Sequence, residues 1–166
     1  MVDLYEILKK LEISYEEVEH EAVFTMEDIK KLDEHLEGMQ LKNLFVKDRF
    51  DNRYLIVVDE DKRVDLKALK ENLNLNKLSF CKEDELMNIL KITSGAVTPL
   101  AVVNDKEKEV IVILDEDMID KDILVHPLVN TKTMKLNYKD LIKLFDNQKT
   151  NYIISNIPIK ECEMKK

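Results

Sequence analysis

The chain has few of the residues that break regular structure, and few that build disulfide or metal frameworks. Its 166 residues include two glycines, three prolines and two cysteines, and tryptophan is absent. We therefore expect few loops, built mainly from Asn, Asp and Lys, which take over turn positions when Gly and Pro are scarce. Cys81 and Cys162 form no CxxC motif, which favours two reduced thiols in a cytoplasmic protein.

Long apolar runs and a basic charge balance are also missing. The longest apolar run, residues 110–114, is far shorter than the roughly 20 residues that span a bilayer. The N-terminus lacks a basic start followed by an apolar stretch, so we expect neither a membrane partner nor a secretory signal. The net charge of −8 argues against broad nucleic-acid binding, DNA included, but allows a local basic patch that contacts one end of a nucleic acid.

Hydrophobic periodicity predicts interspersed helices and strands. Helical spacing is found at residues 4–11, 66–73, 83–90 and 138–145, with Asp3, Asp65 and Asn137 as the caps of the first, second and fourth helices. A partial capping box at Thr25 predicts one more helix that ends near residue 35. Strands are expected at residues 14–18, 41–47, 54–59, 78–80, 100–103, 110–114, 123–125, 132–136 and 152–154.

Tight turns between several of these strands decide the fold class. The segment at residues 48–53, for example, is rich in turn-forming residues and predicts a hairpin. Together with the interspersed helices, this predicts an α+β fold: a single domain over residues 1–166 with a mixed β-sheet flanked by helices. A glycine-rich phosphate loop is absent, which argues against P-loop and dinucleotide-binding folds.

Familiar catalytic arrangements are missing too. The three histidines, His20, His35 and His126, have no His or Cys partner at metal-ligand spacing, so we expect no metal and no cofactor. The sequence contains no nucleophile-elbow motif. Cys81 lies in the apolar context LSFC, where a buried, inert thiol is the better interpretation than a nucleophile.

Three segments remain as candidates for a binding site. In the strand that begins the segment KNLFVKD, Lys42 and Leu44 share one face, while Asn43 and Phe45 share the other. Lys42 could line a pocket, or it could be an edge-strand lysine that discourages aggregation. The strand pattern favours the second interpretation.

The other two segments are loops. Gly95, Ala96, Val97, Thr98 and Pro99 form a connection that could present carbonyls and amides to a ligand or could simply join two elements. In the segment HPLVN, His126 precedes a proline and is therefore held extended. Asn130 could hydrogen-bond a ligand or stabilise its own turn.

Read in order, these segments resemble one family. The residues at 20–25, 42–48, 95–105 and 126–131 read HEAVFT, KNLFVKD, GAVTPLAVVND and HPLVNT. In this order and spacing they are similar to the prolyl-tRNA editing domain family, which also occurs as an insertion in bacterial prolyl-tRNA synthetases. The resemblance extends over residues 4–145. Glu21 departs from the pattern, since relatives often carry Pro there, and this affects the rigidity of an entry loop more than the chemistry.

The resemblance implies a freestanding, trans-acting deacylase that hydrolyses mischarged aminoacyl-tRNA. The segments KNLF and HPLVN look like the alanyl-tRNA(Pro) deacylase branch. Cysteinyl-tRNA deacylation is the alternative reaction, and a non-catalytic module that senses tRNA or an amino acid is the alternative class. The implied partner is the acceptor end of tRNA(Pro), with prolyl-tRNA synthetase as a second candidate.

The resemblance also suggests a role for each segment. Lys42 would orient the terminal nucleotide and compensate negative charge on the ester, and a ribose hydroxyl of the terminal adenosine would help to activate water. The backbone of residues 95–99 would hold the aminoacyl group, and His126 and Asn130 would form the pocket floor. Asn43 would support Lys42 or touch the RNA. Candidate contacts to the RNA backbone are Lys47, Arg49, Arg53, Arg63, Lys132 and Lys135. A size sieve would admit alanine and exclude proline.

Overall fold

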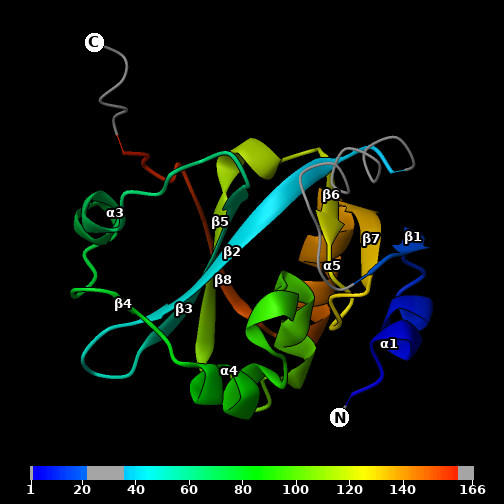
Figure 1. Cartoon of the computed structure of the whole chain (residues 1–166), viewed down its shortest axis with the longest axis horizontal. Coiled ribbons are helices and arrows are strands. Elements are labelled where there is room, and N and C mark those ends of the chain that lie inside the picture. Colours follow the sequence, from blue (N-terminus) through cyan, green and yellow to red (C-terminus); the bar gives the residue numbers. More distant parts are fainter. Residues whose placement is uncertain (1, 22–35, 161–166) are drawn as a thin grey trace.

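An eight-stranded mixed sheet forms the centre of the molecule (Figure 1). The computed structural model of the chain describes residues 2–21 and 36–160. The strands are β1 (Glu16–Glu19), β2 (Met39–Lys47), β3 (Arg53–Asp59), β4 (Ser79–Phe80), β5 (Val110–Asp115), β6 (Asp122–Val125), β7 (Lys132–Asn137) and β8 (Asn151–Ser155). Their order is β1-β7-β6-β2-β3-β5-β8, with β4 beside β2. β2 runs antiparallel to β3 and parallel to β6, so the predicted mixed sheet is confirmed.

The described helices begin where the sequence predicts. They are α1 (Leu4–Lys10), α3 (Leu66–Asn72), α4 (Glu83–Leu90) and α5 (Tyr138–Gln148). The carboxylates of Asp3 and Asp65 and the amide oxygen of Asn137 each accept a backbone N–H of the first turn, as expected of N-caps. The helix predicted from Thr25 to residue 35 lies outside the described residues.

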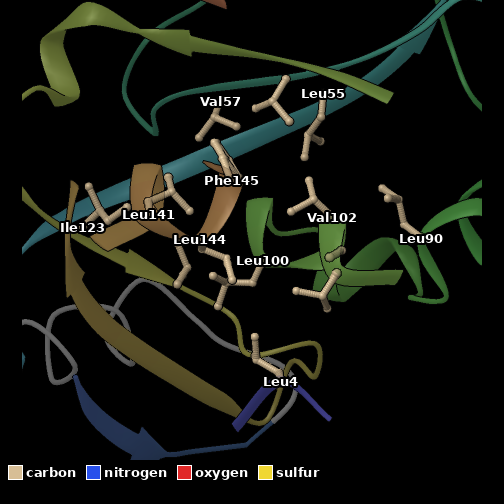
Figure 2. Packing of buried hydrophobic residues seen from close by; sticks show 14 of the residues in the cluster. Leu4, Leu55, Val57, Leu90, Leu100, Val102, Ile123, Leu141, Leu144 and Phe145 are labelled. Carbon is tan, nitrogen blue, oxygen red and sulfur yellow. The ribbon is translucent and has the colours of Figure 1, made fainter. Parts of the chain in front are cut away.

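Two apolar cores lie on opposite faces of the sheet. Leu55 and Val57 of β3 belong to the larger core with α1, α4 and α5 (Figure 2), while Ile56 and Val58 of the same strand belong to a smaller core that contains Leu69 of α3. Neighbouring residues of a strand point to opposite faces. The register of each strand therefore decides which core, and which surface, a side chain reaches.

A buried carboxylate fixes the register of the central hairpin. Asp48 is only 3% exposed, and its Oδ1 accepts the backbone N–H groups of Phe50 and Asn52 at 2.8 and 2.9 Å. Its Oδ2 accepts the side-chain amide of Asn52 at 2.9 Å. Burial alone would raise the pKa of Asp48, but these hydrogen bonds outweigh it and lower the pKa below the ordinary value. The turn thereby sets the pairs Lys42 with Val58 and Asn43 with Val57.

One predicted strand is wrong. Residues 100–103 form part of a 3₁₀ helix, η2 (Pro99–Asn104), in which all six residues are buried. A short, uniformly apolar run does not distinguish a buried strand from a buried helix by its periodicity. The flanking residues favour the helix over the strand. Pro99 occupies the first turn, and the Thr98 hydroxyl accepts the Leu100 N–H at 3.3 Å.

We expect Asp48→Ala to destabilise the protein by about 2 kcal/mol, because two backbone donors of the turn lose their acceptor. The stabilisation that Asp48 supplies should be fully present above its ordinary pKa of 3.8 and should be lost as pH falls through its lower folded pKa. Urea unfolding of the wild type, Asp48→Ala and the exposed-turn control Asp61→Ala measures both effects. Equal stability of the two variants would contradict this role for the turn.

Candidate functional site

The central strand places the predicted site residues on two different surfaces. Lys42 pairs with Val58, whose side chain belongs to the smaller core, and Asn43 pairs with Val57, whose side chain belongs to the larger core. Lys42 and Asn43 therefore face opposite sides of the sheet, as the strand period predicts. Any ligand that contacts both side chains has to pass over the strand itself.

Asn43 connects the strand to the first candidate loop. Its Nδ2 donates to the carbonyl oxygen of Val97 at 3.1 Å, which fixes the orientation of the side-chain amide. Its Oδ1 is buried and has no hydrogen-bond partner in the part of the chain that the structure describes. A buried acceptor without a partner costs free energy. This oxygen is therefore available to a ligand donor.

The two candidate loops meet at a glycine. Gly95 lies in the 3₁₀ turn η1 (Ser94–Ala96), and its φ is not positive, so unusual backbone angles do not explain it. A Cβ added at Gly95 would instead lie 3.0 Å from Nδ2 of Asn130. The absence of a side chain lets the Asn130 amide approach the backbone closely. The two loops thus meet at Gly95 and Asn130, while Ala96, Thr98 and Pro99 are buried.

His126 is held in a defined orientation within the second loop. Its Nδ1 lies 3.0 Å from the carbonyl oxygen of Lys132, which can only accept, so Nδ1 carries a proton. The following turn is tight, since the Leu128 N–H donates to the His126 carbonyl at 2.9 Å and Leu128 has a φ of 70°. A positive φ is uncommon for leucine and marks a constrained loop. The neutral ring therefore presents Nε2 as an acceptor.

Burial keeps His126 neutral. Its removal from water lowers the pKa below the ordinary value of 6.5, and the nearby His20 lowers it further, while the hydrogen bond to the Lys132 carbonyl opposes both effects. The rings of His20 and His126 lie edge to face with centroids 6.2 Å apart. His20 Nε2 also lies 2.7 Å from the Thr133 hydroxyl. The HEAVFT motif thus begins beside His126, although residues 22–25 lie outside the described ranges.

A small cavity brings Asn43 and His126 together. Its volume is about 140 Å³, and its lining residues are Gln40, Leu41, Asn43, Glu60, Leu124, Val125, His126 and Thr133. Pockets for drug-sized ligands measure about 300–1,000 Å³, so this cavity suits a group no larger than a small amino acid. Sequence reasoning missed Gln40, Glu60 and Thr133. Strand alternation could not have found them all, because Gln40 is an even-numbered residue of β2 like Lys42, and Glu60 lies just beyond the end of β3.

Lys42 lies in a separate groove on the opposite face. Its Nζ donates to the carbonyl oxygen of Lys62, and because an ammonium has three donors, two remain for a ligand. The groove has a volume of about 440 Å³. It is lined by Lys42, Leu44, Arg63, Val64, Asp65, Leu66, Lys67, Phe80 and Lys160. The structure therefore does not bring Lys42 into the cavity that contains Asn43 and His126.

Most of the cations predicted to contact RNA already have protein partners. Glu85 accepts Lys47 Nζ at 2.7 Å and Arg53 at 3.2 Å. The hydrogen bond from Lys47 is the main reason why the pKa of Glu85 falls to about 2. Lys135 pairs with Glu16 and Asp122, Lys132 lies over the Tyr5 ring, and Arg49 lies over the Phe50 ring. Of the six, Arg63 alone has no such partner within the described residues.

Cys81 has the character of an inert thiol. It is partly buried beside β2, and this burial raises its pKa from the ordinary 9.0 to about 11. A thiol with so high a pKa carries almost no thiolate at neutral pH and is a poor nucleophile. Cys162 lies outside the described residues.

Neither a metal-ligand cluster nor a membrane-spanning helix occurs among the described residues. No three of their His, Cys, Asp or Glu side chains converge as a metal site requires. Nor does any helix within residues 2–21 and 36–160 combine the length and apolarity needed to cross a bilayer.

Comparisons with known proteins give a consistent picture. Residues 20–144 match the aminoacyl-tRNA editing domain family. The chain is 40% identical to the prolyl-tRNA editing protein ProX of Acetoanaerobium sticklandii over 139 residues, which cover 82% of this chain and 85% of that protein. It is 35% identical to prolyl-tRNA synthetase associated domain-containing protein 1 of Danio rerio over 157 residues, covering 92% and 85%.

A solved structure shares the fold. It is described as a candidate trans-editing enzyme for prolyl-tRNA synthetase, and it superposes with a TM-score of 0.71 over 96% of this chain and 99% of its own. The sequence identity is only 15%. This likeness therefore supports the α+β fold, with its mixed sheet and flanking helices.

The lowered pKa of His126 predicts a measurable loss of stability in mild acid. Between the ordinary pKa of 6.5 and the lower pKa of the folded state, the unfolded chain binds more protons on this ring than the folded chain. Unfolding therefore becomes easier as pH falls, by at most about 1.4 kcal/mol per pH unit. The pH dependence of unfolding between pH 7 and about 5 should be shallower in His126→Gln. Identical slopes for the two proteins would show that His126 is not held neutral.

Proposed function

The chain belongs to the aminoacyl-tRNA editing domain family and is an aminoacyl-tRNA deacylase, and from this premise we propose that it hydrolyses alanyl-tRNA(Pro) in trans. Two observations support this substrate. The 40% identical relative is named a prolyl-tRNA editing protein, and the segments KNLF and HPLVN resemble the alanyl-tRNA(Pro) deacylase branch. The partner would be the acceptor end of tRNA(Pro), in the cytoplasm, with prolyl-tRNA synthetase as the enzyme whose errors are removed.

The small cavity beside Asn43 is the observation that carries the proposal. At about 140 Å³ it can take a compact side chain, whereas each added methylene has to displace packed protein atoms. A site of this kind separates amino acids by size, which a synthetase cannot do for a smaller competitor through binding energy alone. Cysteine is also small, so cysteinyl-tRNA remains the competing substrate. The measured ratio of the two rates decides between them.

Asn43 and the loop at residues 95–99 would hold the aminoacyl group. The unpaired Oδ1 of Asn43 suits the α-ammonium of an aminoacyl ester, since a charged donor gains most from a buried acceptor. The hydrogen bond from Nδ2 to the Val97 carbonyl keeps this oxygen in place. Asn130, lying against Gly95, would close the floor of the site together with His126.

The reaction is hydrolysis of the ester between the amino acid and the terminal ribose. A water oxygen bonds to the ester carbonyl carbon, the bond from that carbon to the ribose oxygen breaks, and the ribose oxygen takes up a proton. Glu60 is the one carboxylate among the lining residues of the cavity. We propose that the neighbouring ribose hydroxyl helps to activate the water, with Nε2 of the neutral His126 as a hydrogen-bond acceptor on the cavity wall.

Lys42 would act from the other side of the strand. Its ammonium has two donors free after the bond to the Lys62 carbonyl. We propose that it binds the phosphate of the terminal nucleotide while the aminoacyl group lies beside Asn43, so that the substrate crosses β2 between these neighbouring residues. Because Lys42 lies across β2 from the cavity, its role would be to position the ester rather than to contact the charge that develops on it.

The proposal predicts a clear order of substrates. At catalytic enzyme concentrations, alanyl-tRNA(Pro) should be deacylated far faster than prolyl-tRNA(Pro), because the proposed size sieve would admit alanine and exclude the larger proline ring. Parallel time courses with alanyl-, cysteinyl- and prolyl-tRNA(Pro) measure this directly, with heat-inactivated protein as the control for spontaneous hydrolysis. Loss of proline at a rate equal to that of alanine would refute an editing role, and faster loss of cysteine would reassign the substrate.

Substitutions in β2 test the roles of its two polar side chains. Lys42→Ala should slow single-turnover deacylation by about 100-fold or more, because loss of the phosphate contact misplaces the ester, and a misplacement of about 1 Å can cost on the order of 100-fold in rate. Lys42→Arg should also be impaired, because a planar fork does not replace a compact ammonium. Asn43→Ala should slow the same step. Lys47→Ala is the matched control on the same strand, because Lys47 is paired with Glu85.

Thermal melts establish that each of these variants is folded. A folded Lys42→Ala protein with a near wild-type rate would show that Lys42 has no part in the reaction. Lys42 would then be interpreted as an edge-strand lysine that discourages aggregation.

A further inference from the structure

A strongly basic surface surrounds α3, on the face of the sheet opposite the small cavity. The groove next to Lys42 and an adjoining hollow of about 310 Å³ share Leu66 and Lys67 as lining residues, so they form one continuous depression. Six cations line it: Lys42, Arg63, Lys67, Lys70, Lys77 and Lys160. We name this depression the α3 groove. On a chain with a net charge of −8, such a concentration of one sign requires an explanation.

The groove contains almost no compensating negative charge. Asp65 is the single acidic lining residue, and its Oδ1 is already engaged as the N-cap of α3, accepting the Ala68 N–H at 3.0 Å. Lys42 donates to a backbone carbonyl. Among the described residues, the other five cations form no ion pair and no side-chain hydrogen bond. Elsewhere Lys47 and Lys62 are paired with Glu85 and Asp115. Six cations thus share one depression with a single carboxylate.

An exposed aromatic ring adds a second recognition element. Phe80 of β4 lines the groove beside Lys42 and is 60% exposed. The strand that carries it is held against the end of β2, since Phe80 pairs with Val46 and Cys81 donates its N–H to the Phe45 carbonyl at 2.9 Å. The ring is thus presented from a paired backbone. Cations along a groove together with an exposed ring are typical of surfaces that bind single-stranded nucleic acid.

We propose that the α3 groove binds the single-stranded 3′ end of the tRNA, with its lysines on successive phosphates and a base stacked on Phe80. The inference rests on the proposed deacylase function, because it supplies a path for the RNA that leads to the ester. Lys42 lies in the groove, and the adjacent Asn43 lies in the cavity across β2. RNA that follows the groove to Lys42 therefore arrives one residue away from the proposed aminoacyl site.

Substitutions that remove positive charge from α3 and from the segment after it test this inference. The variant Lys67→Gln, Lys70→Gln, Lys77→Gln removes three groove cations and leaves Lys42 and the cavity intact. The control Lys9→Gln, Lys10→Gln, Lys143→Gln makes the same charge change at exposed positions of α1 and α5, which pack against the other face. Phe80→Ala tests stacking separately. The probe for binding is uncharged tRNA(Pro), measured by fluorescence anisotropy over a series of salt concentrations.

The triple groove variant should bind tRNA(Pro) roughly tenfold or more weakly, and the magnitude of its salt slope should fall by about 2. Phe80→Ala should weaken binding by roughly fivefold or more. The control should match the wild type. In addition, hydrolysis of 3′-O-alanyl-adenosine, which lacks the preceding nucleotides, should proceed at the wild-type rate in the triple groove variant and in the control, since both leave Lys42, Phe80 and the cavity intact.

Two results would overturn the inference. If tRNA affinity is unchanged in the groove variants, the groove does not bind the RNA, and an acidic protein partner would be the better explanation of its charge. If the control loses as much affinity as the triple groove variant, the effect comes from net charge and not from the groove. The readout is also independent of catalysis. If the wild type binds tRNA(Pro) through the groove and yet does not deacylate alanyl-tRNA(Pro), the groove is an RNA-binding surface and the proposed reaction is wrong.

Discussion

The register of β2 against β3 is the constraint on which the rest of the structure depends. The buried turn at Asp48 sets this register, and the two-residue period of a strand then sends Lys42 and Asn43 to opposite faces. A slip of one residue would exchange the two side chains and place an ammonium in the small cavity. The same alternation divides the apolar residues of β3 between two cores. Stability and site geometry are therefore set by the same hydrogen bonds.

This division gives each face of the sheet its own chemistry. The cavity face is small, partly buried and equipped with an unpaired acceptor on Asn43 and a neutral imidazole on His126, which suits the neutral and ammonium groups of an aminoacyl ester. The opposite face is open and basic, which suits phosphates. An aminoacyl-tRNA end carries both kinds of group at neighbouring positions. Under the proposed function, the two surfaces would bind the two parts of one substrate, with β2 between them.

Much of the fold could be predicted from the sequence because its signals are local. Caps at Asp3, Asp65 and Asn137 and the hairpin turn depend on residues close in the chain, and these predictions are confirmed. The strand predicted at residues 100–103 was wrong, because a buried apolar run has no periodicity that distinguishes a strand from a helix. The contacts that build the site are long-range: Asn43 and Val97 are 54 residues apart, and the cations of the α3 groove come from separate segments. No pattern in one stretch of sequence shows such convergence.

The central claim is that the aminoacyl group binds on the Asn43 face of β2 while the RNA lies on the Lys42 face. A crystal structure with a non-hydrolysable analogue, an adenosine carrying alanine through a 3′-amide and extended at its 5′ side by two nucleotides, tests it most directly. The alanyl group should occupy the cavity between Asn43 and His126, with its ammonium on Asn43 Oδ1, and the phosphates should lie along Lys42 and α3. An alanyl group bound in the α3 groove, with the cavity empty, would contradict the account.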